Sequence, residues 1–149
     1  VPYGTIGNGS LGHLAMTLLA KRAGTNFAHI PYRGGGPLIN DAIGGHVPIS
    51  IGSVALLATH LQAGTLRPLA QTGAQRASTL SSLPTVAESG FPGFEAEAWW
   101  GVFAPAGTPA DIVGRMQQAI KAVIDEPAVA QKMIEQGQTP VGSTPAELA

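Results

Sequence analysis

The residues whose types and spacing best suit chemistry form a glycine-rich turn near the N-terminus, Thr5–Ser10 (TIGNGS). Gly7 and Gly9 allow backbone conformations that other residues avoid, and they place no side chain between the backbone and a ligand. Ser10 is a good N-cap for a helix that starts at the next residue. The first N–H groups of a helix have no partner inside it and lie at the positive end of its dipole. The turn therefore predicts a site for a carboxylate or a phosphate.

A second interpretation of the same glycines is a dinucleotide site, because Gly7, Gly9 and Gly12 spell the G-x-G-x-x-G pattern. The strand in front of the pattern would be short, and no acidic residue follows at about twenty residues to bind a ribose hydroxyl. Arg33 lies near that distance and could instead bind a 2′-phosphate. An NADP-dependent oxidoreductase domain is therefore the alternative to a simple anion site.

The remaining polar side chains suggest no catalytic machinery. Ser10 lacks the G-x-S-x-G context of a nucleophilic serine, because position 8 is asparagine. The chain has no cysteine, and its nine acidic residues are dispersed without an evident pair. The histidines lie 14 to 17 residues apart, at His13, His29, His46 and His60. We therefore expect no metal site, and no cofactor apart from the NADP of the alternative interpretation. His13 could either contact a ligand or cap the helix, and the other histidines are expected to be structural.

The elements that would position this turn follow from the hydrophobic pattern. Helices are predicted after Ser10, from Pro37 to Ile43 and from Ser53 to Gly64, with strands over residues 27–32, 47–51 and 66–71. The first helix would bury a face made of Leu11, Leu14, Ala15, Leu18 and Leu19. This alternation predicts an α/β fold with an open, mostly parallel sheet and flanking helices. The turns at residues 7–9, 33–36 and 52–53 would follow strand carboxyl ends, so we expect them at the ligand-binding edge of the sheet.

The second half of the chain differs in character. Residues 72–92 are expected to be a connection with at most one helical turn at 85–89, and residues 97–104 a strand. Trp99 and Trp100 in that strand are interpreted as core residues, or alternatively as one wall of a cleft. Helices are predicted from Thr108 to Ile124 and from Asp125 to Gly137. Residues 144–147 have a helix-start pattern with no helix to follow, and the chain starts inside a strand, so we interpret it as a fragment of a longer protein.

Composition excludes several classes of protein. The chain has 149 residues, of which 44% are hydrophobic and 11% charged, which is typical of a folded domain. Its net charge of −1 and its eight scattered Lys and Arg residues argue against a nucleic-acid partner. No apolar stretch approaches the ~20 residues that a membrane-spanning helix needs, and no signal peptide is visible.

Four motifs occur in order along the chain, and together they resemble a known family. They are Thr5–His13 (TIGNGSLGH), His29–Gly34 (HIPYRG), Leu83–Glu95 (LPTVAESGFPGFE) and Trp100–Pro109 (WGVFAPAGTP). In these motifs the sequence is similar to the solute-binding proteins of tripartite tricarboxylate transporters, often called the Bug family. The resemblance extends over essentially the whole chain.

The resemblance implies a periplasmic, non-catalytic receptor with a type II periplasmic-binding-protein fold. Two α/β lobes of such a receptor close on a small carboxylate and deliver it to membrane permease subunits. Residues 1–98 would form the second lobe, and residues 99–149 a crossover strand and helices that return toward a largely absent first lobe. A module that only mediates assembly, without a ligand, remains an alternative beside the NADP-dependent domain.

The same resemblance implies which residues bind the ligand. The ligand loop of the second lobe would comprise Thr5, Gly7, Asn8, Gly9 and Ser10, and the turn after the third strand would add Gly52 and Ser53. Many relatives have an acid or an amide at or beside that second turn, where this chain has glycine, serine and valine. The resemblance therefore implies a carboxylate ligand without naming it.

Overall fold

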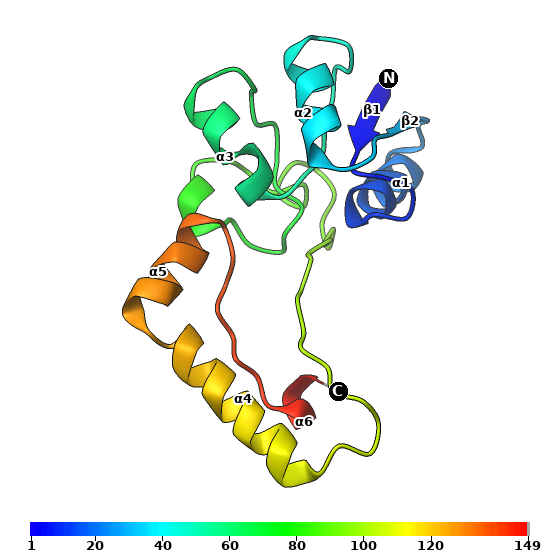
Figure 1. Cartoon of the computed structure of the whole chain (residues 1–149). Helices are drawn as coiled ribbons and strands as arrows, with labels where there is room; N and C mark the ends of the chain where they lie inside the picture. Colours follow the sequence, from blue (N-terminus) through cyan, green and yellow to red (C-terminus); the bar gives the residue numbers. More distant parts are fainter. Residues whose placement is uncertain (149) are drawn as a thin grey trace. The chain divides into compact units, whose positions relative to one another are not determined.

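The computed structural model describes residues 1–148. The chain divides into two compact units, Val1–Ala98 and Trp99–Ala149 (Figure 1). The first unit contains strands β1 (Pro2–Thr5) and β2 (Ala28–Pro31), helices α1 (Leu11–Ala23), α2 (Gly35–Ile43) and α3 (Val54–Gln62), and the short 3-10 helix η1 (Ser78–Leu80). The second unit contains α4 (Ala110–Ile124), α5 (Pro127–Glu135) and α6 (Pro145–Leu148).

The sheet of the first unit is parallel, as predicted, but small. β1 and β2 pair in parallel along their whole length. The backbone around Ser50 lies along the other edge of β1, where two hydrogen bonds of 2.8 and 3.1 Å join it to the N–H and the carbonyl of Gly4. The strand expected over residues 47–51 is thus reduced to this single bridge, since Pro2 of β1 has no N–H to donate to the carbonyl of Val47, where the ladder would continue.

Two further predicted strands are not formed. Residues 66–71 run as an irregular segment in which Gln71 alone bridges Thr85, and Leu69 is 59% exposed. Residues 97–104 are also irregular, and they are exposed throughout. Both segments have the composition of strands, but neither has a full neighbouring strand among residues 1–148. Strand propensity has little effect without such a partner.

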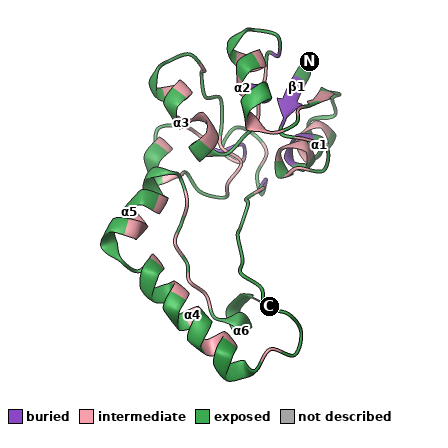
Figure 2. Cartoon of the chain, viewed as in Figure 1, coloured by how far each residue is buried: buried purple, intermediate pink, exposed green. Residues whose placement is uncertain are grey.

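Every buried residue of the described chain belongs to the first unit (Figure 2). Leu38 of α2 is fully buried over β1, where a Cβ atom at Gly4 would lie 2.5 Å from the Leu38 Cδ1 atom. Ala15 of α1 packs with Val86, which belongs to the connection predicted over residues 72–92, and with Phe94, which follows that connection. The glycine in β1 therefore lets α2 approach the sheet closely.

The predicted apolar face of α1 is partly wrong. Leu11 and Leu14 are 38% and 57% exposed, while Met16 is buried. The cluster around Phe94 contacts α1 only from Ala15 onward, so it does not cover Leu11 and Leu14. This exposed first turn is the one that follows the glycine-rich stretch.

The second unit contains both helices that the sequence predicts there. α4 starts after Pro109, and α5 has Pro127 at its first position, where the missing N–H has no cost. The helix-start pattern at residues 144–147 itself forms a single helical turn, α6. Thr144 and Glu147 form a reciprocal capping box there, with bonds of 2.7 and 3.3 Å.

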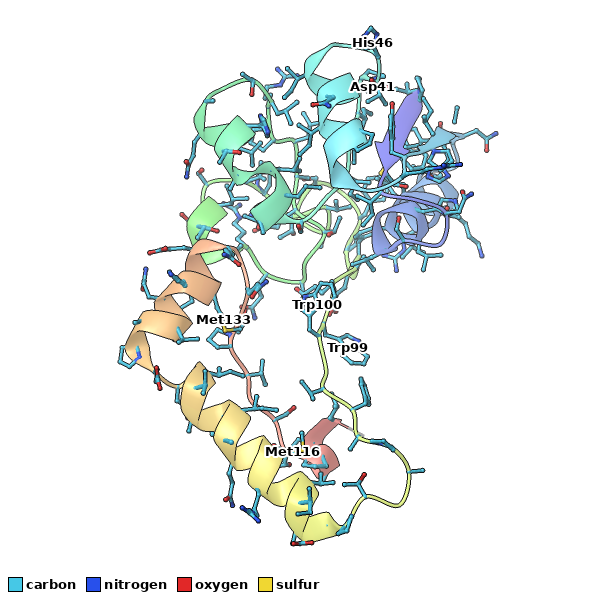
Figure 3. All side chains as sticks on the ribbon, in the orientation of Figure 1. Asp41, His46, Trp99, Trp100, Met116 and Met133 are labelled. Carbon is cyan, nitrogen blue, oxygen red and sulfur yellow. The ribbon has the colours of Figure 1, made fainter. Side chains whose placement is uncertain are left out.

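The two tryptophans do not lie in a core. Trp99 and Trp100 are 68% and 86% exposed, on the extended segment that precedes α4 (Figure 3). Their interpretation as core residues is therefore wrong for this chain, because no strand forms to carry them into one. None of the helices in residues 1–148 combines the length and the apolar character that crossing a bilayer requires.

Candidate functional site

The candidate site is the turn between β1 and α1. β1 ends at Thr5, whose side chain is fully buried. Gly7 and Gly9 have φ angles of +146° and +73°, which other residues rarely adopt, so the turn requires both glycines. Ser10 caps α1, because its Oγ atom accepts the N–H of His13 at 3.3 Å. The turn and its cap are as predicted from the sequence.

Three N–H groups of the turn are already bonded within the chain. The Gly7 N–H donates to the Thr5 hydroxyl oxygen (3.2 Å), and the Ser10 N–H donates to the Gly7 carbonyl (3.3 Å). The Gly9 N–H donates to Nδ1 of His13 at 3.1 Å. Thr5 and His13 therefore satisfy amides that we expected to be free. A ligand has to use other donors or displace these contacts.

Other N–H groups at this edge have no hydrogen-bond partner among the described residues. At the start of α1 and of α3 they belong to Asn8, Leu11, Gly12, Gly52, Ser53, Val54 and Ala55. Unpaired donors at the positive ends of helix dipoles are the groups that bind carboxylates and phosphates. This edge of the first unit therefore has two sets of such donors, from two helices.

The turns predicted to share one edge of the sheet do lie together. The N–H of Gly34, just before α2, donates to the carbonyl of Ile6 at 3.3 Å. The first turn of α1 touches the segment before α3, since a Cβ atom at Gly12 would lie 2.8 Å from the Ile51 Cγ2 atom. The prediction that the three turns gather at one edge of the sheet is confirmed, and binding of a ligand at that edge stays a prediction.

The second predicted turn has the same design as the first. Ser53 caps α3 with an extended backbone, and its Oγ atom accepts the N–H of Leu56 at 3.3 Å. Gly52 and Ser53 are exposed and directly follow Ile51, the residue that contacts the first turn of α1. The two capped helix starts are therefore neighbours. In the first turn, Asn8 and Gly9 are exposed as well.

The structure also brings together two histidines that are far apart in the sequence. The rings of His13 and His29 are parallel within 8°, and their centroids lie 4.0 Å apart. His29 lies opposite Tyr3 in the β1–β2 ladder, and its Nε2 atom is 2.7 Å from the Thr5 hydroxyl oxygen. Burial, and after it the nearby charge of His13, lower the pKa of His29.

The sequence interpretation missed this pair because it compared only distances along the chain. The signal that could have found it is the pairing of β1 with β2, which places His29 beside the turn that precedes His13. Arg33, the other side chain considered for anion binding, is exposed in the turn before α2. Residues 1–148 contain no group of three or more His, Cys, Asp or Glu side chains close enough to hold a metal ion.

Comparisons with known proteins place the chain among transport receptors. Residues 1–148 match the family described as "Tripartite tricarboxylate transporter family receptor". A similar curated protein is Protein BugT of Bordetella pertussis, which is 36% identical over 137 residues; these are 92% of this chain and 42% of BugT. The chain spans less than half the length of the first curated relatives that it matches.

Two solved structures show the same architecture. Rpa4515 of R. palustris, solved with adipate, is 36% identical and superposes with a TM-score of 0.90 over 99% of this chain and 50% of that chain. The periplasmic binding protein BugD is 30% identical, with a TM-score of 0.77 over 95% of this chain and 48% of its own. The predicted fold class is confirmed, and the alternative of an NADP-dependent oxidoreductase domain is not supported.

Proposed function

This chain belongs to the tripartite tricarboxylate transporter family receptors, and we propose that it forms the part of a solute receptor that binds a small carboxylate. Rpa4515, whose structure contains adipate, is 36% identical to the chain over nearly its whole length. A linear dicarboxylate such as adipate is therefore the first ligand to test. The family describes receptors, and we propose a receptor without catalytic activity.

The observation that carries the proposal is the meeting of two capped helix starts at one sheet edge. The N–H groups of Asn8 and Gly12 are available at the start of α1, and those of Ser53 and Val54 at the start of α3. A carboxylate is only an acceptor, with two oxygens and about four lone-pair sites. It can therefore accept bonds from both helix starts at once, and both dipoles favour its charge.

The residues that we assign to the site have different roles. Asn8, Gly9, Gly52 and Ser53 are exposed and would contact the ligand through their backbone. Thr5, Gly7 and Ser10 hold the turn in shape. The Gly7 carbonyl accepts a hydrogen bond from the Thr5 hydroxyl at 3.0 Å and from the Ser10 hydroxyl at 2.8 Å. A buried Thr5 therefore acts by positioning the turn.

The wider function is also a proposal. BugD, to which the chain is similar, is a periplasmic binding protein, and we propose a periplasmic location for this protein as well. Residues 1–98 would form one lobe, and residues 99–149 would return toward another lobe. Closure of the two lobes on the carboxylate would then present the receptor to membrane permease subunits.

Calorimetry on the full-length protein with adipate and other dicarboxylates tests the proposal. We expect binding, and a loss of affinity of about tenfold or more (~1.4 kcal/mol) in Gly9→Val. Valine is strained at the φ of +73° found there, so it would distort the turn that carries the donors. Binding that is unchanged in Gly9→Val would refute the site assignment.

Gly45→Val is the matched control. Gly45 has a φ of +75°, and a Cβ atom at either glycine would meet nothing within 4 Å. The two variants therefore carry the same backbone strain, but Gly45 follows the end of α2, away from the proposed site. We expect it to bind adipate as the wild-type protein does. A titration with NADPH, followed by fluorescence, should give no signal in any of these proteins.

A further inference from the structure

The stacked histidines form a titratable element next to the proposed carboxylate site. The Gly9 N–H donates to Nδ1 of His13, so this nitrogen carries no hydrogen and the ring is neutral with its proton on Nε2. The neutral imidazole thereby occupies an amide in the centre of the glycine-rich turn. A protonated ring could not make this contact, because its Nδ1 would itself be a donor.

The surroundings of the pair determine where an added proton goes. Two imidazolium rings 4.0 Å apart would repel strongly, so the pair takes up at most one proton in the range where imidazoles titrate. Burial, and after it the charge of His13, lower the pKa of His29, whose Nε2 atom lies 2.7 Å from the Thr5 hydroxyl oxygen. Of the two rings, His13 is the one that holds an amide of the glycine-rich turn, the Gly9 N–H.

Within residues 1–148, no charged side chain is bonded to the histidine pair. The groups that face it are the Thr5 hydroxyl and the Tyr3 ring, whose centroid is 5.1 Å from that of His29. On α1, Thr17 donates to the His13 carbonyl and not to its ring. No Asp, Glu, Lys or Arg side chain forms a hydrogen bond or an ion pair with either imidazole in the part of the chain that the structure describes.

We propose that protonation of His13 opens the glycine-rich turn for its ligand, so that capture of a carboxylate is coupled to the uptake of one proton. Protonation releases the Gly9 N–H and places a positive charge beside the bound anion. Without a ligand, the positive end of the α1 dipole disfavours that charge, so the proton and the carboxylate stabilise each other. This inference rests on the proposed function, since it concerns the same site.

The coupling has a definite sign. Because the protonated form binds the anion better, the affinity rises as the pH falls and reaches a lower limit at high pH. Between about pH 8 and pH 6 we expect the association constant to increase by roughly three- to tenfold. The ligand's own carboxyl groups, with ordinary pKa values near 4, remain ionised over this range.

The test is calorimetry of the full-length protein with adipate in several buffers that differ in their heat of ionisation. The dependence of the measured enthalpy on the buffer gives the number of protons taken up. For the wild-type protein we expect a positive value between zero and one. In His13→Asn the amide oxygen can still accept the Gly9 N–H but cannot titrate, so we expect weaker binding, no proton uptake and no dependence on pH.

His46→Asn is the matched control, because His46 is an exposed histidine in the turn after α2 (Figure 3). It should retain both the affinity and the proton uptake of the wild-type protein. A second readout needs no variant: in NMR spectra of the wild-type protein, the midpoint of the His13 titration should move to higher pH when adipate is bound.

The outcomes separate the two proposals. Binding of adipate without proton uptake, or uptake that persists in His13→Asn, overturns the role of His13 and leaves the receptor function intact. A His13 titration that adipate does not shift overturns it in the same way. Failure of every dicarboxylate to bind at any pH overturns both proposals.

Discussion

At the residue scale, Thr5 connects the sheet, the turn and the histidine pair. Its hydroxyl accepts the Gly7 N–H at 3.2 Å and lies 3.0 Å from the Gly7 carbonyl and 2.7 Å from Nε2 of His29. The side chain is fully buried, so water cannot replace these contacts. The hydroxyl group of Thr5 therefore specifies the shape of the turn. Valine would fill a similar space but has no polar group with which to form these bonds.

Thr5→Val should therefore destabilise the protein by about 1–3 kcal/mol, because it leaves the Gly7 N–H and one His29 nitrogen without a partner. Denaturation with urea measures the change. Thr17→Val is a suitable control, since the exposed Thr17 hydroxyl bonds only to the His13 carbonyl one turn before it. Its effect should stay within about 0.5 kcal/mol. Equal effects of the two substitutions would contradict this role of Thr5.

His29 makes the stability of the fold depend on pH. Burial lowers its pKa below the ordinary value of 6.5, so the folded state binds this proton more weakly than the unfolded state does. The contribution of the neutral His29 ring to the free energy of unfolding is fully present above about pH 6.5. It is lost as the pH falls through the lower pKa that His29 has in the folded state. Melting temperatures should therefore fall with pH below about 6.5 in the wild-type protein and fall less in His29→Gln. A wild-type protein with a constant melting temperature from about pH 7.5 to 5 would contradict this account.

At the element scale, α1 and the segment before α3 are held together through a glycine. A Cβ atom at Gly12 would lie 2.8 Å from the Ile51 Cγ2 atom, which is closer than packed atoms tolerate. Gly12→Ala should separate the two helix starts and cost about 1–3 kcal/mol. Gly114 of α4 has nothing within 4 Å of such a Cβ atom. Gly114→Ala should instead stabilise the protein by about 0.5–1 kcal/mol.

Thermal unfolding of both glycine variants checks this contact. If Gly12→Ala proves as well tolerated as Gly114→Ala, the helix starts are not in close contact and the shared edge is wrong. If Gly12→Ala unfolds too early for a binding assay, Ile51→Ala in the same chain should restore part of the stability, because it removes the atom that the new methyl group would meet.

The elements that could be predicted from the sequence are those with local signals. Ser10 and Ser53 cap helices, Pro127 starts one, and the glycines of the first turn adopt the backbone angles that only glycine favours. These features depend on a few consecutive residues. Parallel pairing of β1 with β2 followed from the alternation of strands and helices.

The features that could not be predicted depend on distant partners. Residues 66–71 and 97–104 have the composition of strands but no ladder to join. The stack of His13 on His29 exists only because α1 returns over the β1–β2 pair. The bond from Gly9 to His13 likewise belongs to the folded turn and removes an amide that the sequence pattern left available.

At the scale of the whole molecule, the two units differ in how much they bury. The buried residues lie in Val1–Ala98, whereas Trp99 and Trp100, the two tryptophans of the sequence, are largely exposed. Large exposed apolar side chains in a row mark a surface that another part of a protein covers. We propose that the other lobe of a longer receptor covers them.

Tryptophan fluorescence tests this proposal. In the 149-residue chain the emission should resemble that of tryptophan in water, and a soluble quencher should reach both rings. In the full-length protein the emission should shift to the blue and quenching should decrease. The same red-shifted emission and the same quenching in both proteins would contradict the proposal that the other lobe covers Trp99 and Trp100.

A crystal structure of the full-length protein with adipate would show directly whether the two helix starts bind the carboxylate. We expect one carboxylate at hydrogen-bond distance, about 2.7–3.2 Å, from the N–H groups of Asn8 or Gly12 at the start of α1. The same carboxylate should also accept from Ser53 or Val54 at the start of α3. Adipate bound elsewhere, with these donors facing solvent or blocked by the chain itself, would contradict this expectation.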